Sequence, residues 1–229
     1  MGETKTEMKC FIAISDLVSL LNMSCGFLSI IFSINNEFKI GALLMMLAII
    51  FDSIDGWVAR KTNRQDTYGF GKNIDSLSDV VSFGVAPAIF IYKCINTTTA
   101  INPMIIIVIS LMIVICGVLR LTRYNVISDK LNTNDFIGFP IPGISFIISA
   151  YYLSGLFDEN IALILSVIVS VLMISNIKYP KFDNNTLIAI SALLIILTPF
   201  NITLYNINIA ALILLLFCLY YLIINLIKK

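Results

Sequence analysis

The chain has 229 residues, of which 59% are hydrophobic and only 13% are charged. Soluble domains average about 45–50% apolar and 25% charged residues, so this composition is typical of a polytopic membrane protein. The formal net charge of +1, without a basic stripe carrying interleaved aromatics, argues against a nucleic-acid partner, and the lack of histidine excludes His-based catalytic triads.

Eight apolar segments approach the length of a transmembrane helix, about 20 residues. They lie at residues 16–34, 39–60, 73–95, 101–124, 140–156, 160–177, 186–200 and 207–227. We therefore expect an all-α integral membrane protein, a bundle of about eight transmembrane helices. Residues 1–229 are expected to form a single polytopic domain, with a core at about 14–177 and C-terminal helices at 184–227.

The basic residues segregate to one side of this predicted bundle. If both termini are cytoplasmic, only Lys39 and Lys93 lie outside, which leaves 13 of the 15 Lys and Arg residues on the inner side. Cytoplasmic loops carry such an excess of basic residues. We therefore expect an even number of spans in the cell membrane and both termini in the cytoplasm. The second span should end, and the third should begin, on the cytoplasmic side.

The first segment carries a strongly polar residue, Asn22, within an apolar context. A polar side chain inside a span can hydrogen-bond a neighbouring helix or can contact a ligand. Both interpretations of Asn22 stay open from the residues alone.

Four aspartates mark the end of the second segment and the start of the third, namely Asp52, Asp55, Asp75 and Asp79. Carboxylates at membrane depth are costly and are therefore functional candidates. On helices the first pair is spaced i,i+3 and the second i,i+4, so each pair shares a face. Carboxylates this close repel one another unless cations lie between them. Oxygen ligands suit Mg²⁺, Mn²⁺ or Ca²⁺.

Small and basic residues accompany the first acidic pair. Gly56 and Ala59 fall on the same helix face as Asp52, where they would let a bulky ligand approach the backbone closely. Arg60 and Lys61 follow directly. They are either membrane anchors on the inner side or ligands of phosphate oxygens.

The stretch Asp52-x-x-Asp55-Gly56-x-x-Ala59-Arg60, followed by Gly71 and Asp75-x-x-x-Asp79, resembles the signature of the CDP-alcohol phosphatidyltransferase family. Enzymes of this family join an alcohol to a lipid phosphate that is activated as a CDP ester, and they release CMP. Ten residues separate Arg60 from Gly71, which is a longer spacing than is usual in the family. Gly69 would restore the shorter spacing but would place Asn73 at the third acidic position, so we align Gly71.

The resemblance implies a divalent-metal site and a homodimer. Two ions, Mg²⁺, Mn²⁺ or Ca²⁺, would be held by Asp52, Asp55, Asp75 and Asp79, with Asp79 as the general base. The predicted CDP-lipid contacts are Asn22, Gly56, Ala59, Arg60, Lys61 and Gly71.

Two further stretches bear on the acceptor alcohol. Arg120-x-x-Arg123-x-Asn125 and the Gly138–Gly143 turn resemble patterns of the phosphatidylserine synthase subgroup. A zwitterionic amino acid needs a cation for its carboxylate, which Arg120 or Arg123 would supply, unless they bind the lipid phosphate or serve as anchors. We expect L-serine as the acceptor, with glycerol 3-phosphate or an inositol phosphate as alternatives.

Two other functions use buried carboxylates. An intramembrane aromatic prenyltransferase would also pair aspartates with Mg²⁺, but it would lack the Gly56, Ala59 and Arg60 positions. A cation or proton transporter commonly shows internal repeats and a site at the midplane. This sequence has no evident repeat, and its aspartates lie at one rim of the predicted bundle.

Overall fold

The computed structural model describes Met8 and residues 11–62, 69–96, 101–127, 135–180, 185–200 and 203–227. The helices are α1 (Ile14–Ile34), α2 (Phe38–Lys61), α3 (Phe70–Asp79), α4 (Ala86–Asn96), α5 (Pro103–Ile127), α6 (Pro142–Leu153), α7 (Glu159–Ile174), α8 (Asn185–Leu197) and α9 (Ile209–Ile227). A π-helical turn, Val80–Val85, joins α3 to α4, and a 3₁₀ turn, Thr198–Phe200, follows α8.

Each of the eight apolar segments predicted from the sequence is helical in the structure. Within the described residues, four stretches are long and apolar enough to cross a bilayer, namely α1, most of α2, the continuous run from α3 to α4, and α5. Helix α6 has only 12 residues, or about 18 Å, against a hydrocarbon thickness of about 30 Å. The protein is thus a helical membrane protein, and the number of crossings contributed by the later helices stays a prediction.

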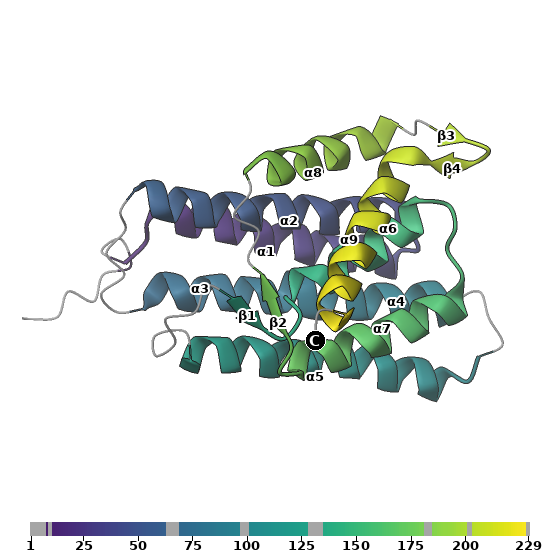
Figure 1. Ribbon diagram of the computed structural model, residues 1–229, viewed down its shortest axis with the longest axis horizontal. Helices are drawn as coiled ribbons and strands as arrows, with labels where there is room; N and C mark the ends of the chain where they lie inside the picture. Colours follow the sequence, from purple (N-terminus) through teal and green to yellow (C-terminus); the bar gives the residue numbers. More distant parts are fainter. Residues whose placement is uncertain are drawn as a thin grey trace, which may run out of the picture.

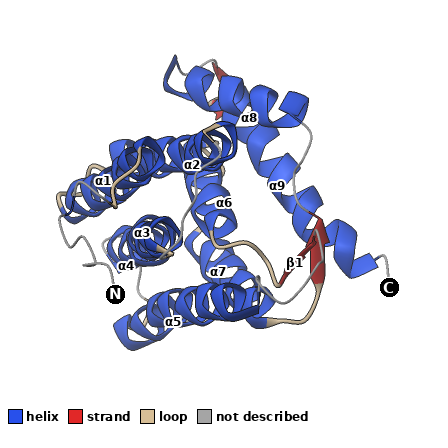
Figure 2. Cartoon of the chain, turned by 90° about the vertical axis from the view of Figure 1, so that its left-hand side faces the viewer, coloured by secondary structure: helices blue, strands red, loops and turns tan. Residues whose placement is uncertain are grey.

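The four long stretches run side by side along the longest axis of the molecule, and α9 crosses them steeply (Figure 1). Viewed from the end, α3 and α4 lie between the α1–α2 pair and α5 (Figure 2). This central position explains why 56% of the apolar window from α3 to α4 is buried, against 33% for α1. The helix that carries Asp75 and Asp79 is therefore enclosed by other helices.

Helix α1 presents a stripe of small and polar residues to the bundle. Its buried residues recur every three or four positions, at Ser15, Asp16, Ser19, Asn22, Cys25, Gly26, Ser29 and Ser33. Small residues allow membrane helices to approach closely and to exchange hydrogen bonds. The Ser29 hydroxyl donates to the Gly41 carbonyl of α2 at 2.9 Å, which fixes α1 against α2.

In the described part of the chain, two short antiparallel ribbons accompany the helices, and the all-α prediction did not include them. Strand β1 (Asp135–Ile137) pairs with β2 (Lys178–Pro180), and β3 (Thr203–Leu204) pairs with β4 (Ile207–Asn208). Strands of two or three residues are too short to show the alternation by which strands are recognised in a sequence. The β1–β2 ribbon joins the chain before α6 to the chain after α7.

Gly26 on α1 is expected to tolerate no side chain. A Cβ at this position would lie 2.5 Å from the Cα and 2.8 Å from the Cβ of Ser82, in the π-helical turn. Overpacking of this kind typically costs about 1–3 kcal/mol. We therefore expect Gly26→Ala to lower the thermal unfolding midpoint of the purified protein.

Gly84→Ala is the matched control, because an added Cβ there would meet no atom within 4 Å. Equal midpoints for the two variants, measured in the same detergent, would contradict the close packing of α1 on the turn.

Candidate functional site

Three aspartates converge at one end of the bundle. Asp52 and Asp55 come from the last turns of α2, and Asp75 comes from α3. Each offers a carboxylate oxygen that lies within 4.8 Å of the other two. Asp55 is 6% exposed, whereas Asp52 and Asp75 are partly exposed. Three oxygens at this separation, in a site that is half shielded from solvent, could hold a hard divalent cation.

Asp79 lies one helical turn after Asp75 and is buried. It is not one of the three clustered aspartates. A buried carboxyl group beside other carboxylates needs a proton or a cation. The Oδ1 of Asp79 accepts a hydrogen bond from Asn22 Nδ2 at 3.1 Å. Asp79 therefore links the cluster to α1.

Asn22 takes the first of the two roles that its sequence position left open, a hydrogen bond to a neighbouring helix, and contact with a ligand stays a prediction. It bridges helices through Asp79, and it also keeps a buried Oδ1 that has no hydrogen-bond partner among the described residues. A buried acceptor without a donor costs about 1–3 kcal/mol. Asn22 Oδ1 is thus a candidate atom for binding a donor of the ligand.

Hydrogen bonds from three serines support this arrangement, and sequence reasoning assigned no role to Ser19 or Ser145. Ser19 Oγ donates to Asp55 Oδ2 at 2.7 Å. Ser82 Oγ donates to the carbonyl of Asn22 at 2.9 Å, and Ser145 Oγ of α6 donates to the carbonyl of Ser82 at 3.1 Å. The helical spacing of polar residues on α1 was the signal that could have identified Ser19.

The small residues of the motif lie beside the carboxylates. Gly56 is half-buried on α2 next to Asp55, and Gly71 is half-buried on α3. Gly71 precedes Asp75 by one turn and so lies on the same helix face. Asn73 is exposed, and its side chain donates to the carbonyl of Gly69 at 2.9 Å. Asp75, not Asn73, thus supplies the third carboxylate, which supports the alignment on Gly71.

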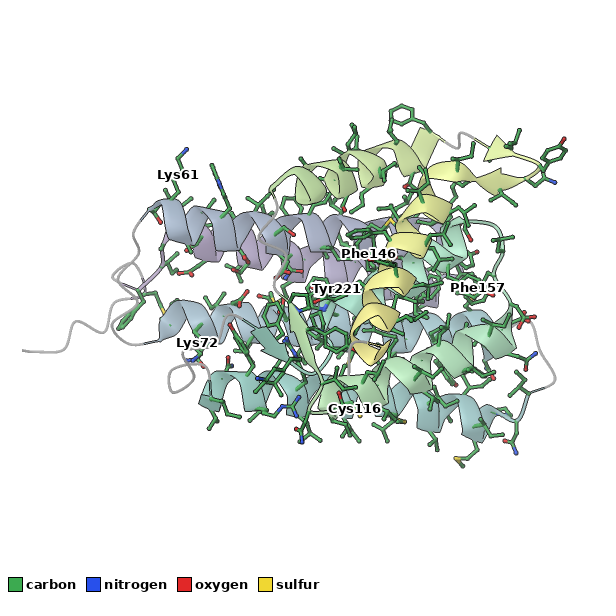
Figure 3. All side chains as sticks on the ribbon, in the orientation of Figure 1. Lys61, Lys72, Cys116, Phe146, Phe157 and Tyr221 are labelled. Carbon is green, nitrogen blue, oxygen red and sulfur yellow. The ribbon has the colours of Figure 1, made fainter. Side chains whose placement is uncertain are left out.

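The other residues predicted to contact a CDP-lipid lie near the end of α2. Ala59 is half-buried there, and the side chain of Arg60 lies outside the described part of the chain. Lys61 is exposed and points away from the bundle (Figure 3), with its Nζ 4.6 Å from the centroid of the Trp57 ring. Contact between Lys61 and a ligand stays a prediction.

Arg120 is a buried cation near the end of α5. It is 5% exposed, and its guanidinium carbon lies 5.5 Å from the ring centroid of Tyr124 and 5.3 Å from that of Phe136. It interacts electrostatically with Asp79. Its Nε has no hydrogen-bond partner among the described residues. A buried charge with an unused donor is a candidate site for an anionic group.

Arg123, one turn after Arg120, is in a different environment. Its Nη1 donates to the carbonyl of Ile174 at 3.0 Å, and its Nη2 contacts three further carbonyl oxygens at 2.9–3.0 Å, those of Ile137, Met173 and Ser175. A cation at the last carbonyls of a helix complements the helix dipole. Arg123 therefore holds the end of α7 and strand β1 against α5.

Asn125, the last residue of the same pattern, ties α5 to the helix of the acidic residues. Its Nδ2 donates to Ser76 Oγ at 2.8 Å, and its carbonyl accepts from Lys72 Nζ at 2.9 Å. Ser76 directly follows Asp75 on α3. The three polar residues of this motif thus have separate environments, and of its two arginines it is Arg120 whose Nε is left without a partner.

Comparison with known proteins agrees with this site. The family model of the CDP-alcohol phosphatidyltransferases matches residues 12–174, a segment that includes all four aspartates and both arginines. The chain is 51% identical over 173 residues to the archaetidylserine synthase of Methanothermobacter thermautotrophicus, an alignment that covers 76% of this chain and 72% of the relative.

Two further relatives carry the name CDP-diacylglycerol–serine O-phosphatidyltransferase. The one from Methanocaldococcus jannaschii is 40% identical over 188 residues, 79% of this chain and 80% of the relative. The one from Bacillus subtilis is 34% identical over 171 residues, 74% of this chain and 90% of the relative. The matched segment, the extent of these alignments and the carboxylate cluster agree, and the chain belongs to the CDP-alcohol phosphatidyltransferase family.

Proposed function

We propose that this protein is a membrane phosphatidyltransferase that moves the phosphatidyl group of a CDP-activated lipid to the hydroxyl of L-serine and releases CMP. The observation that carries the proposal is the group of three carboxylates within 4.8 Å, in the motif of this family. Relatives at 51% and 40% identity are named for transfer to serine. One name specifies an archaetidyl lipid and the other a diacylglycerol, so both CDP-lipids belong in the test.

The carboxylate cluster is the proposed metal site. Asp52, Asp55 and Asp75, with Asp79 shared, would hold two divalent ions, Mg²⁺ or Mn²⁺. When bound, the ions neutralise the pyrophosphate of the CDP-lipid and polarise the bond to the leaving CMP. The donor set fits, because it consists of carboxylate oxygens only.

Asp79 is the proposed general base. The serine hydroxyl oxygen forms the new bond to the lipid phosphorus, its proton passes to Asp79, and CMP departs with the electrons of the broken P–O bond. A carboxylate that ligates a cation strongly is a weaker base. Asp79 lies outside the group of three, and Asn22 holds one of its oxygens, which leaves the other for the proton.

Substrate binding divides between the two sides of the cluster. The nucleotide side comprises Asn22, Gly56, Ala59, Arg60, Lys61 and Gly71, where small residues give a bulky group access to the backbone. Arg120 is the proposed partner of the serine carboxylate, because guanidinium groups bind carboxylates through two parallel hydrogen bonds. Arg123, whose donors are taken by carbonyl oxygens, positions this part of the site.

The proposed orientation places the active site in the cytoplasm and both termini on the same side. Lys61 and Lys72 lie at one end of the bundle (Figure 3), as does the end of α5 with its arginines. A basic end of this kind faces the cytoplasm in membrane proteins. The homodimer implied by the family resemblance is part of this proposal.

Release of CMP from a defined CDP-lipid tests the function directly. Purified protein with Mn²⁺ and either CDP-diacylglycerol or its ether-lipid analogue is supplied with serine, glycerol 3-phosphate or an inositol phosphate. We expect CMP release that depends on serine. Release with another alcohol but not with serine would overturn the acceptor, and cation uptake by liposomes without any CMP release would favour a transporter.

Replacement of Arg120 by lysine should weaken serine binding more than lipid binding. Lysine keeps the positive charge but loses the planar pair of donors. We expect the KM for serine to rise by about 10-fold or more, which is the scale of a charge-assisted hydrogen bond of about 1.5–3 kcal/mol. The KM for the CDP-lipid should stay close to the wild-type value. A selective rise in the CDP-lipid KM would instead assign Arg120 to the lipid phosphate.

A further inference from the structure

We propose that Tyr221 of α9 is a positioning residue for the serine subsite, and that it acts through the β1–β2 ribbon on Arg120. This inference rests on the proposed function of Arg120. Tyr221 lies well beyond the segment that the family model matches, residues 12–174, so the assignment adds a residue of the C-terminal helices to the site.

The first step is the contact between α9 and β2. The Tyr221 hydroxyl donates to the carbonyl of Pro180, the last residue of β2, at 2.9 Å. Its ring centroid lies 5.5 Å from that of Tyr179 and 5.9 Å from that of Phe139. The rings of Phe139 and Tyr179 lie 5.3 Å apart in an edge-on arrangement. These three buried rings hold the ribbon on α9, and Figure 3 shows Tyr221 on the side of α9 that faces it.

The second step runs across the ribbon. Phe136 on β1 is directly opposite Tyr179 on β2, and the pair of strands is only three residues long. Side chains opposite each other on paired strands lie on the same face, with Cβ atoms about 4.5–5.5 Å apart, and they interact. A ribbon this short is not stable by itself. Its position therefore depends on contacts from both sides, those of Arg123 on α5 and those of Tyr221 on α9.

The third step reaches the guanidinium group. The Phe136 ring centroid is 5.3 Å from the Arg120 guanidinium carbon, and the Tyr124 ring is 5.5 Å away. The two rings are 5.9 Å from each other, so both flank Arg120. A cation over aromatic rings is attracted to their faces. Since Nε makes no hydrogen bond to the described residues, these rings orient a donor that is available to the substrate.

The experiment compares Tyr221→Phe with Tyr220→Phe in the full-length protein. Tyr221→Phe removes the hydroxyl that bonds Pro180 and that also interacts electrostatically with Arg120, while Tyr220 is 63% exposed and serves as the matched control. We expect Tyr221→Phe to raise the KM for serine by about 3- to 10-fold, the range that one hydrogen bond supports. The KM for the CDP-lipid and kcat should change by less than about 2-fold, and Tyr220→Phe should match wild type.

A double mutant tests the route through the ribbon. If Tyr221 acts through Phe136, then adding Tyr221→Phe to Phe136→Leu should raise the serine KM by less than about 2-fold, because the two changes interrupt one path. An unchanged serine KM in Tyr221→Phe, a parallel rise in both substrate KM values, or full additivity would each overturn the proposal. Wild-type protein that releases no CMP with serine would instead refute the proposed function itself.

Discussion

Asp79→Asn is expected to lose turnover while keeping its affinity for the CDP-lipid. Asparagine retains the shape of the side chain and an oxygen that can accept from Asn22 Nδ2, but it cannot take the proton of the serine hydroxyl. General-base catalysis typically contributes about 10²–10⁴-fold, so we expect kcat to fall by about that factor. The measurements are CMP release under saturating serine and equilibrium binding of the CDP-lipid in the presence of Mn²⁺.

Glu37→Gln provides a charge-matched control for this variant. Glu37 is exposed in the turn between α1 and α2, at the opposite end of these helices from the aspartates. It should behave as wild type in both assays. If Asp79→Asn lost CDP-lipid binding together with turnover, the main role of Asp79 would be that of a metal ligand. Another group would then have to accept the proton.

Asp55→Asn is expected to lose divalent-metal binding and, with it, activity. Asp55 contributes one of the three clustered oxygens, and an amide oxygen carries no charge with which to hold the cation. We expect activity to fall by about 10²-fold or more at a Mn²⁺ concentration that saturates wild type, with partial recovery at higher Mn²⁺. The measurements are Mn²⁺ titrations of CMP release and of binding by calorimetry.

Ser19→Ala tests the hydrogen bond that orients the metal ligand Asp55, without changing the ligand itself. Ser19 donates to Asp55 Oδ2 at 2.7 Å, and loss of such a partner of a ligand typically lowers metal affinity by about 10–100-fold. Ser24→Ala is the control, because Ser24 is exposed on the same helix and bonds only its own helix at the Leu20 carbonyl. If Asp55→Asn required no more Mn²⁺ than wild type, Asp55 would not be a ligand of the catalytic ion.

Asp55 and Asp79 have different surroundings in the structure, and the sequence motif does not show this difference. In the sequence, Asp55 and Asp79 are two positions of one pattern. In the structure, a serine of α1 bonds Asp55 inside the cluster of three, and an asparagine of α1 bonds Asp79 beside it. The difference comes from α1, more than 30 residues earlier in the chain, so spacing within the motif carries no information about it.

The arginines make the same point. Arg120 and Arg123 are one helical turn apart and were predicted together as ligands of serine or phosphate. Carbonyl oxygens of strand β1 and of the end of α7 accept the hydrogen bonds of Arg123. Aromatic rings enclose Arg120 instead. Three of the four carbonyl contacts of Arg123 come from residues 50 to 52 positions away, so local sequence could not show which of the two arginines keeps a free donor.

From the amino-acid sequence alone followed the membrane class, the helical segments, the four aspartates and the family, because hydrophobic length and i,i+3 or i,i+4 spacing are local properties of the chain. Only the tertiary structure decided that three carboxylates lie within 4.8 Å of one another and that Asn22 donates a hydrogen bond to the fourth, Asp79. It also decided that α9 packs on the β1–β2 ribbon. The physical reason is that these contacts form between helices that are distant in sequence. Small residues on α1 let such helices approach closely. A polar group buried between them costs free energy unless it is hydrogen-bonded.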